Sequence, residues 1–408
     1  ELIVIPIISL LGNKFKWFSL SSDRSMKKFA ELIFSPYLPI LSFDKFTKGK
    51  IVHVNSALAC GGAERQVVNT LIGLKQLGTY NVSIVCERLH DFDDSDFYLL
   101  KLQGMGITTK KLKHVTFENM LDTKNLENFN QHFKKIPTSI KQAVINYAYE
   151  FYYSRPEVVH LWQDSTNIIA GIAACIVGVP RIILSTRNMA PFRFGYFQRY
   201  MKPAYMALSY HPNVKFINNS NAGMNDYLKW LNLSEDSFSV IHNGINRTDI
   251  KAVSIDKKNE FRQKYGLPNE VIVIGSIFRF YAEKDPLLWI NTAAEIIKRS
   301  KNKNIIFLLI GAGPLMTTMQ DLILKHGLSD KVIMPGVMKI PAVPLSLMDI
   351  FLLTSINEGT PNVVIEAQLS GIPVVSTDAG GVRDAIKNSI TGWIVDSRSP
   401  IDLAEKVL

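Results

Sequence analysis

The chain has 408 residues, 47% of them hydrophobic and 20% charged, and a formal net charge of +10. The length favours two domains, and the composition can bury a large core, which excludes a disordered chain, a collagen-like repeat and a disulfide-stapled miniprotein. The positive charge favours anionic partners, such as nucleotides, phosphorylated substrates, nucleic acid or an anionic membrane face, without choosing among them.

Residues 1–50 combine apolar runs with several lysines and show no clean period. We expect an N-terminal extension that packs on the fold or forms the tail of an upstream region; the alternative is a basic surface lying on a membrane. The apolar run 2–11 is too short to span a membrane, and it follows Glu1 rather than the basic start of a signal peptide. Because the chain begins without Met and closes on an incomplete helical pattern at 402–408, we expect a fragment cut at both ends.

Between residues 51 and 245, β-branched apolar runs alternate with helical stretches. Strands are predicted at 51–54, 82–86, 158–162, 181–185, 216–218 and 239–242, and helices at 63–77 and 167–177. Such alternation predicts βαβ units and a parallel sheet covered on both faces.

Residues 246–269 are charged and predict a linker with a short helix, after which the alternation resumes. Strands are predicted at 271–277, 305–310, 332–334, 350–353, 374–376 and 392–395, and helices at 286–299, up to 326 and after Pro361. We therefore expect an α/β fold of two Rossmann-like, doubly wound domains, 51–245 and 246–408, that face each other across a cleft. Ligands of such sheets bind beyond the carboxyl ends of the strands.

The stretch NEGTPNVVIEA at 357–367 leads from a predicted strand into a predicted helix. Thr360 is a suitable N-cap, Pro361 suits the first helical position, and Gly371 is a natural stop. The backbone N–H groups and the dipole of such a helix start favour an anion. This stretch therefore predicts a phosphate-binding loop.

Two carboxylates lie in this stretch, Glu358 in the loop and Glu366 on the helix. At this separation they suit hydroxyl groups at the two ends of a sugar diphosphate. The alternative is a capped loop followed by a solvated glutamate.

Cations and glycines follow other predicted strands. Arg279 and Lys284 suit a diphosphate and would stabilise it as a leaving group; the alternative is a pair of ordinary surface salt bridges. Glycine pairs that would let a phosphate or sugar approach the backbone are Gly61 with Gly62, and Gly311 with Gly313. Each glycine pair alone is weak evidence.

Taken together, these motifs resemble the retaining, nucleotide-sugar-dependent glycosyltransferases of family 4 (glycosyltransferase group 1), which have the GT-B fold. The resemblance covers about residues 51–408. It rests on EGTPNVVIEAQLSGIPVV with its E-x7-E pair, GGAERQ at 61–66, the Arg279 to Lys284 spacing, GAGP at 311–314 and HNGI at 242–245.

The resemblance implies that the second domain binds a nucleotide diphosphate sugar, UDP- or GDP-linked, and the first domain a glycan or lipid-linked acceptor. It implies transfer with retention, without cofactor or metal. Glu366 would hold the ribose, Glu358 would face the donor sugar, and Arg279 and Lys284 would neutralise the diphosphate. The donor-binding residues would be Gly61, Gly62, Gly311, Gly313, Gly359, Thr360, Pro361, Asn362 and Glu366.

Departures from the family pattern affect the predicted acceptor site, His160, Trp162 and Arg187. Trp162 stands where many members have a second histidine, and Arg187 suits an acceptor phosphate. We assign Asp164 a polar role near the reacting centre, so the predicted catalytic set is Glu358, Arg279, Lys284 and Asp164. Asp285 replaces the glycine that usually follows the lysine.

Two other patterns favour structural interpretations. Asp94-Ser95-Asp96 matches a D-x-D metal motif of another glycosyltransferase fold, but a capping acidic turn is favoured, and no metal site is predicted. Residues 192–202 interleave aromatic and basic side chains. A helix with inward aromatics is slightly favoured there over an interfacial membrane helix or nucleic-acid stacking, and a lipid-linked acceptor would suit the same surface.

Three sparse cysteines, Cys60, Cys86 and Cys175, predict reduced thiols in a cytoplasmic protein, and the alternative location is peripheral, on the inner face of the plasma membrane. We predict a glycosyltransferase of bacterial surface polysaccharide synthesis. The alternatives are a catalytically silent GT-B scaffold, or another GT-B enzyme such as a UDP-sugar epimerase or a glycan phosphorylase. A nucleic-acid binder is disfavoured because the cations form no dense stripe.

Overall fold

The computed structural model describes residues 24–34, 45–92, 95–116, 136–245, 253–301, 304–338 and 341–408. The chain divides into two compact units, each considered by itself below. Unit 1 takes Glu1–Asn218 and Met224–Ile241, and unit 2 takes Asn219–Gly223 and His242–Leu408.

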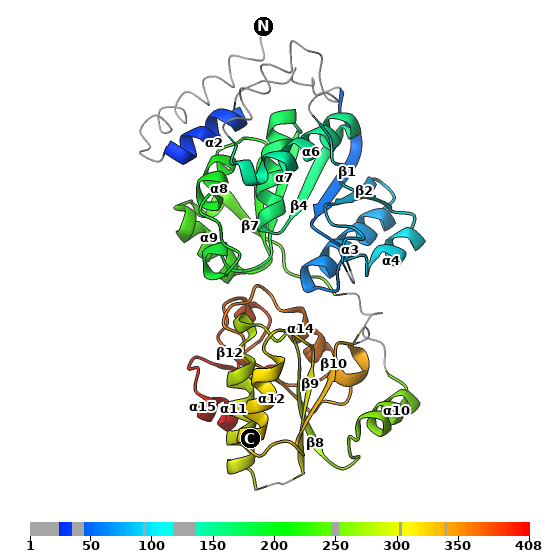
Figure 1. The fold of residues 1–408 in the computed structure, drawn as a ribbon, viewed down its shortest axis with the longest axis vertical. Helices are drawn as coiled ribbons and strands as arrows, with labels where there is room; N and C mark the ends of the chain where they lie inside the picture. Colours follow the sequence, from blue (N-terminus) through cyan, green and yellow to red (C-terminus); the bar gives the residue numbers. More distant parts are fainter. Residues whose placement is uncertain are drawn as a thin grey trace. The chain divides into compact units, whose positions relative to one another are not determined.

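Unit 1 contains a seven-stranded parallel sheet in the order β3-β2-β1-β4-β5-β6-β7 (Figure 1). Its strands are β1 Thr47–Asn55, β2 Asn81–Cys86, β3 Thr108–Lys111, β4 Pro156–Trp162, β5 Arg181–Thr186, β6 Val214–Asn218 and β7 Phe238–Val240. Its helices are α2 Arg24–Phe34, α3 Gly62–Gln76, α4 Leu99–Gly104, α6 Thr138–Ser154, α7 Asp164–Val177, α8 Met201–Ser209 and α9 Asn221–Leu231.

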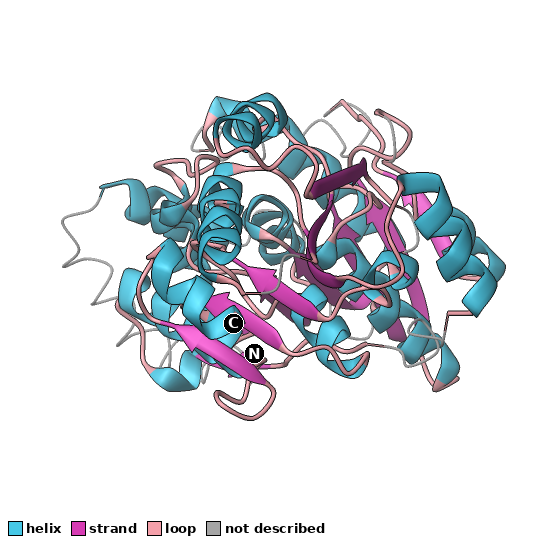
Figure 2. Ribbon diagram, turned by 90° about the horizontal axis from the view of Figure 1, so that it is seen from below, coloured by secondary structure: helices cyan, strands magenta, loops and turns pink. Residues whose placement is uncertain are grey.

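Alternate residues of the same strand enter different cores, which explains the unbroken apolar runs. On β1, Val52 and Val54 pack with α6, α7 and α8, whereas Ile51 packs with α3 and α4. Helices therefore cover both faces of the sheet (Figure 2). At about 25 cal/mol per Å² of apolar surface, burial of such strands is the main stabilising contribution to the domain.

The described part of the N-terminal extension is the amphipathic helix α2. Phe29, Ala30 and Ile33 of α2 are buried in the core that contains α7 and α8. Strand β1 begins at Thr47, four residues before the predicted start at Ile51. Residues 1–23 and 35–44 of the extension lie outside the described residues.

Unit 2 contains a six-stranded parallel sheet in the order β10-β9-β8-β11-β12-β13. Its strands are β8 Ile272–Ile277, β9 Ile305–Ile310, β10 Val332–Gly336, β11 Ile350–Leu353, β12 Val374–Thr377 and β13 Gly392–Val395. Its helices are α10 Ile255–Tyr265, α11 Pro286–Arg299, α12 Met316–Lys325, α13 Ala342–Leu345, α14 Asn362–Leu369 and α15 Pro400–Val407. Both faces are covered here too, since Phe307 and Leu308 of β9 enter different cores.

The prediction of a helix over 192–202 is wrong. A single 3-10 turn covers Pro191–Arg193, and α8 begins only at Met201. Phe192 and Tyr196 are half exposed rather than packed inward. The side chain of Arg193 instead donates two hydrogen bonds to Asp226 of α9, at 2.7 and 2.8 Å.

Candidate functional site

In unit 1, the loops after β1 and β4 meet because these two strands are neighbours although they are distant in sequence. From β1 the strand order runs to β2 and β3 in one direction, and from β4 it runs to β5, β6 and β7 in the other. The position between β1 and β4 is therefore a topological switch point, where ligands of such sheets usually bind. The predicted glycines Gly61 and Gly62 lie here, at the start of α3. Gln163, which directly follows β4, donates to Glu64 of α3 at 2.8 Å.

Four side chains of the predicted acceptor region form a stacked group. His53 of β1 and His160 of β4 are in register, and Trp162 shares their face because side chains alternate along a strand. The His160 and Trp162 rings stack with centroids 4.4 Å apart, and the Arg187 guanidinium lies 4.9 Å from the Trp162 ring centroid. The structure therefore brings the side chains of His160, Trp162 and Arg187 together.

His53 is the member of this group that sequence reasoning missed. The indole N–H of Trp162 donates to His53 Nδ1 at 3.1 Å, so this ring nitrogen carries no proton. Burial lowers the pKa of His53 to about 3, and burial, followed by the neighbouring His53 and Arg187 side chains, lowers the pKa of His160. Both rings are therefore neutral at physiological pH. Arg187 is partly buried, and burial lowers its pKa to about 10.

Asp164, which we predict to have a polar role near the reacting centre, is buried and hydrogen-bonded. This residue begins α7, and its buried carboxylate accepts from the hydroxyl groups of Tyr205 at 2.7 Å, Tyr196 at 3.1 Å and Tyr227. Burial raises the pKa of Asp164 against the opposing effect of these hydroxyl groups. With its oxygens occupied by three tyrosines, Asp164 has the contacts of a structural anchor between α7, α8 and α9.

In unit 2, the loop after β11 and the helix α14 contain six buried polar side chains: Thr354, Ser355, Glu358, Thr360, Asn362 and Glu366. Helix α14 begins at Asn362, with Pro361 at the N-cap position and no side chain capping it. The prediction of Thr360 as N-cap is therefore wrong by one residue, and its hydroxyl donates instead to the carbonyl of Asn219. Gly371 does end this helix region, in the left-handed conformation at φ +78°.

Lys284 and Glu358 form a buried ion pair at the centre of this region. Lys284 Nζ lies 2.6 Å from Glu358 Oε1, and their side chains are 16% and 11% exposed. The hydroxyl of Ser355 donates to the same oxygen at 2.7 Å. The contact follows from topology, because β8 and β11 are neighbours at the switch point and each precedes one of the two residues.

Arg279 is not part of this buried pair. Its side chain is 70% exposed, and it contacts Glu283 at 3.7 Å and the Tyr281 ring. It follows the same strand as Lys284, at the loop where the carboxyl end of β8 leaves the sheet. The two predicted cations therefore differ: Lys284 is already neutralised, and Arg279 is exposed to solvent.

Gly311 and Gly313 have a packing reason to be glycine. A Cβ at Gly311 would lie 1.9 Å from the carbonyl oxygen of Phe278, and one at Gly313 would lie 2.5 Å from that of Phe280. The close approach is between two backbone segments, the loops after β8 and β9. Absence of a side chain at these positions is therefore explained without a ligand.

The HNGI segment supports the same loop. The side-chain amide of Asn243 donates to the carbonyl of Thr360 at 2.7 Å and to the side chain of Asn362 at 2.8 Å. This holds the peptide that enters α14. The predicted donor-binding residues from Thr360 to Glu366 thus occupy one buried, hydrogen-bonded surface of unit 2, together with Glu358 and Lys284.

Most of unit 2 is similar to a known protein family. The model of the family described as glycosyl transferases group 1 matches residues 257–408. This part of the chain is therefore similar to group 1 glycosyltransferase domains. The Lys284–Glu358 pair and the α14 surface both lie within it.

Similar proteins extend over more of the chain. The Vi polysaccharide biosynthesis protein VipC/TviE of Salmonella typhi is 28% identical over 383 residues, 90% of this chain and 64% of its own length. A UDP-Gal:alpha-D-GlcNAc-diphosphoundecaprenol alpha-1,3-galactosyltransferase of Escherichia coli is 26% identical over 249 residues, 59% of this chain and 62% of its own length. The chain thus spans a little under two-thirds of these relatives.

Solved structures show that the fold is GT-B. Anabaena HepE in complex with UDP-glucose superposes with a TM-score of 0.69 at 18% identity, over 87% of this chain and 88% of that one. WaaG, a glycosyltransferase involved in lipopolysaccharide biosynthesis, superposes with a TM-score of 0.62 at 12% identity, over 88% and 89%. The prediction of two Rossmann-like domains of the GT-B class is confirmed.

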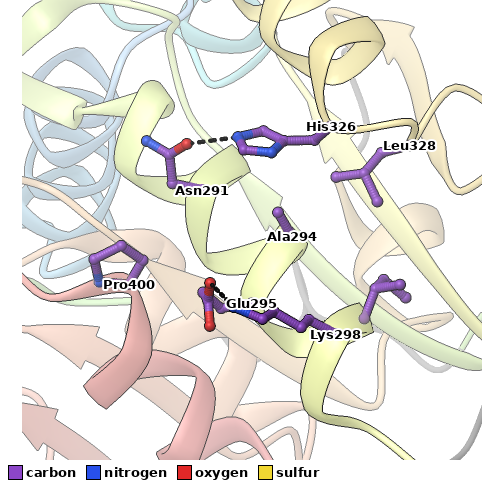
Figure 3. Close-up of a pocket in the computed structure, with 8 residues that line it drawn as sticks. Asn291, Ala294, Glu295, Lys298, His326, Leu328 and Pro400 are labelled. Carbon is purple, nitrogen blue, oxygen red and sulfur yellow. Dashed lines mark hydrogen bonds and ion pairs between the residues drawn. The ribbon is translucent and has the colours of Figure 1, made fainter.

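A surface depression elsewhere on unit 2 contains none of the predicted site residues. It lies along the C-terminal half of α11, between Asn291, Glu295, His326 and Pro400 (Figure 3). His326 contacts the side-chain oxygen of Asn291 at 2.8 Å. Lys284 precedes the opposite end of the helix, so this depression is separate from the loops at the carboxyl ends of the strands.

No helix in the described part of the chain combines the length and apolar character needed to cross a bilayer.

Proposed function

We propose that the protein transfers a sugar from a nucleotide diphosphate sugar, with retention of configuration, to a glycan or lipid-linked acceptor. The observation that carries this proposal is the buried Lys284–Glu358 pair beside the uncapped start of α14. A cation, a carboxylate and a helix N-terminus at one place suit a diphosphate and the hydroxyl groups of the sugar attached to it. The family match of residues 257–408 supports the same chemistry.

In this mechanism Lys284, with Arg279, stabilises the negative charge that develops on the departing diphosphate. Glu358 orients the donor sugar and Glu366 holds the ribose. The acceptor attacks from the face that the diphosphate leaves, and the departing phosphate takes the acceptor's proton. These groups supply charge stabilisation without a divalent ion, so we propose a metal-independent enzyme.

The substrate classes are proposed from the similar proteins. HepE has been crystallised with UDP and UDP-glucose, and the Escherichia coli relative uses a UDP-sugar and a diphosphoundecaprenol-linked acceptor. We propose a UDP-sugar as donor, a lipid-linked or glycan acceptor held by His160, Trp162 and Arg187, and a role in bacterial surface polysaccharide synthesis on the cytoplasmic side of the membrane. Three free cysteines, Cys60, Cys86 and Cys175, agree with a reducing compartment.

A thermal-stability panel tests the donor site. We expect UDP, and not ADP or CMP, to raise the melting temperature in the presence of EDTA, because a ligand at 100 times its dissociation constant stabilises a protein by about 2.7 kcal/mol. A rise in melting temperature with GDP instead of UDP would show that the donor carries guanine rather than uracil. Binding without turnover of any nucleotide sugar would favour the silent scaffold, and release of free sugar without an acceptor would favour the epimerase.

A further inference from the structure

Asp285 occupies a strained backbone position for a residue with a side chain. Its φ is +43°, in the left-handed region that favours glycine, which is the residue the family pattern has here. Its carboxylate makes two contacts that glycine lacks. Oδ1 accepts from the backbone N–H of Leu288 at 3.1 Å and caps α11, and Oδ2 accepts from Arg398 at 2.5 Å.

Arg398 connects this position to the strand that leads to Glu358. It lies between β13 and α15, and its guanidinium donates to the carbonyl of Ser355 at 3.0 Å and to that of Thr354 at 2.9 Å, in addition to Asp285. Only a planar group with several donors in fixed directions can reach all three acceptors at once.

The two backbones joined by Arg398 are those that carry the buried ion pair. The Thr354 hydroxyl donates to the carbonyl of Asp285 at 2.9 Å, and the N–H of Ile356 donates to that of Glu283 at 2.8 Å. Lys284 therefore stands between two residues that are fixed to the β11 loop. These hydrogen bonds between the two segments, together with the opposite charges, set the distance between Lys284 and Glu358.

We propose that Asp285 and Arg398 act as a pair of positioning residues that hold Lys284 where it meets the diphosphate of the donor. This inference rests on the proposed function. It explains how the chain dispenses with glycine at position 285, because the carboxylate offsets the backbone strain with a helix cap and an ion pair. Neither residue touches the donor; both act through Lys284 and the β11 loop.

The test compares ligands with and without the second phosphate. We expect Arg398→Gln to weaken UDP about tenfold, as loss of a charge-assisted hydrogen-bond network does, and to weaken UMP less than threefold, measured by isothermal titration calorimetry. The ratio of the two dissociation constants is the decisive readout, because general damage to the domain would weaken both ligands alike. Arg398→Lys keeps the charge but not the fork, so we expect UDP affinity between wild type and Arg398→Gln.

Arg299→Gln is the matched control. Arg299 also bridges acidic residues on α11 and α15, Glu295 at 3.0 Å and Glu405 at 3.3 Å, at the far end of α11 from Lys284. We expect this variant to lower the melting temperature about as much as Arg398→Gln does and to leave both nucleotide affinities unchanged. An equal loss of UDP affinity in the control would overturn the proposal.

Asp285→Asn separates positioning from direct contact with the phosphate. Asparagine can still cap α11 but cannot form the ion pair, so positioning predicts weaker UDP binding. If Arg398 bound phosphate itself, removing its carboxylate partner would strengthen UDP binding, and that result would refute the proposal. Unchanged UDP affinity in both Asp285→Asn and Arg398→Gln would also refute the proposal. If the wild-type protein bound no nucleotide diphosphate, that result would instead overturn the proposed function.

Discussion

At the scale of single residues, the structure separates two glutamates that look equivalent in the E-x7-E pattern. Glu358, in the loop, accepts hydrogen bonds from both Lys284 and Ser355. Glu366 is the fifth residue of α14 and is buried. Glu358→Gln removes the negative charge but keeps a side-chain oxygen that can still accept a hydrogen bond from Ser355. Glu358→Gln is therefore a milder change than Glu358→Ala, which would leave Lys284 buried without its carboxylate.

We expect Glu358→Gln to reduce sugar transfer by about 100-fold or more, the usual order for a group acting in the transition state, with a change below threefold in the dissociation constant of UDP. UDP binding survives because Lys284 keeps the phosphate as its partner. Initial rates with a UDP-sugar and calorimetry with UDP measure the two effects. Transfer at the wild-type rate would remove Glu358 from the site.

In contrast to Glu358→Gln, Glu366→Ala should mainly affect nucleotide binding. We expect UDP binding to weaken about tenfold because the ribose hydroxyl groups lose a buried acceptor, as expected for a hydrogen bond to a charged group. The comparison of UDP with inorganic pyrophosphate is the control, since pyrophosphate has no ribose and its binding should be unchanged. Equal weakening of both ligands would mean that the substitution disturbs α14 rather than ribose recognition.

At the scale of elements, strand order determines which loops can form a site. The chain leaves β8, continues to β9 on one side and returns through β11 on the other, so the loops after β8 and β11 share a sheet edge. The loop after β9 packs against the same region through its glycines. Gly311 combines φ +147° with a backbone neighbour, whereas Gly327 has φ +66° and open space around it.

This contrast gives a prediction on stability. We expect Gly311→Ala to lower the free energy of unfolding by about 3 kcal/mol or more, because strain and overlap with the Phe278 carbonyl add up. Gly327→Ala should cost only about 1 kcal/mol, the penalty of the left-handed conformation alone. Urea unfolding of both variants measures the difference, and equal losses would show that the loops after β8 and β9 do not pack as described.

At the scale of the whole molecule, the buried histidines of unit 1 make stability depend on pH. His53 has a pKa lowered from 6.5 to about 3 by burial, and His160 shifts in the same direction. The unfolded chain binds protons near pH 6.5 that the folded chain does not. The stability contributed by these residues is therefore present above pH 6.5 and is lost as the pH falls below it.

We expect these two residues to lower the free energy of unfolding by about 3 kcal/mol between pH 7.5 and 5.5. Each residue contributes about 1.36 kcal/mol, because the unfolded chain takes up its proton mainly over the one pH unit below 6.5. His53→Gln can still accept the Trp162 indole N–H and does not titrate, so its loss over this range should be about half as large. Unfolding at both pH values measures this. An unchanged pH slope in His53→Gln would show that His53 is not held neutral.

The sequence by itself determined the class of fold and most element positions. Apolar runs such as Ile305–Ile310 report burial on both faces, which only a covered parallel sheet provides, and the E-x7-E stretch is local enough to be read directly. Local rules failed where a distant contact outweighed them. Arg193 donates to Asp226, 33 positions away, and the hydroxyl of Thr360, predicted to cap α14, donates to the carbonyl of Asn219.

Only the tertiary structure decided which residues meet. Strand order places Lys284 on Glu358 across 74 positions, brings Arg398 to both of their loops and sets His53 beside Trp162. It also brings the hydroxyl groups of three tyrosines to the carboxylate of Asp164. The reason is physical: periodicity and capping act within a few residues, whereas contacts between parallel strands and their loops depend on the order of the strands, which no local pattern encodes.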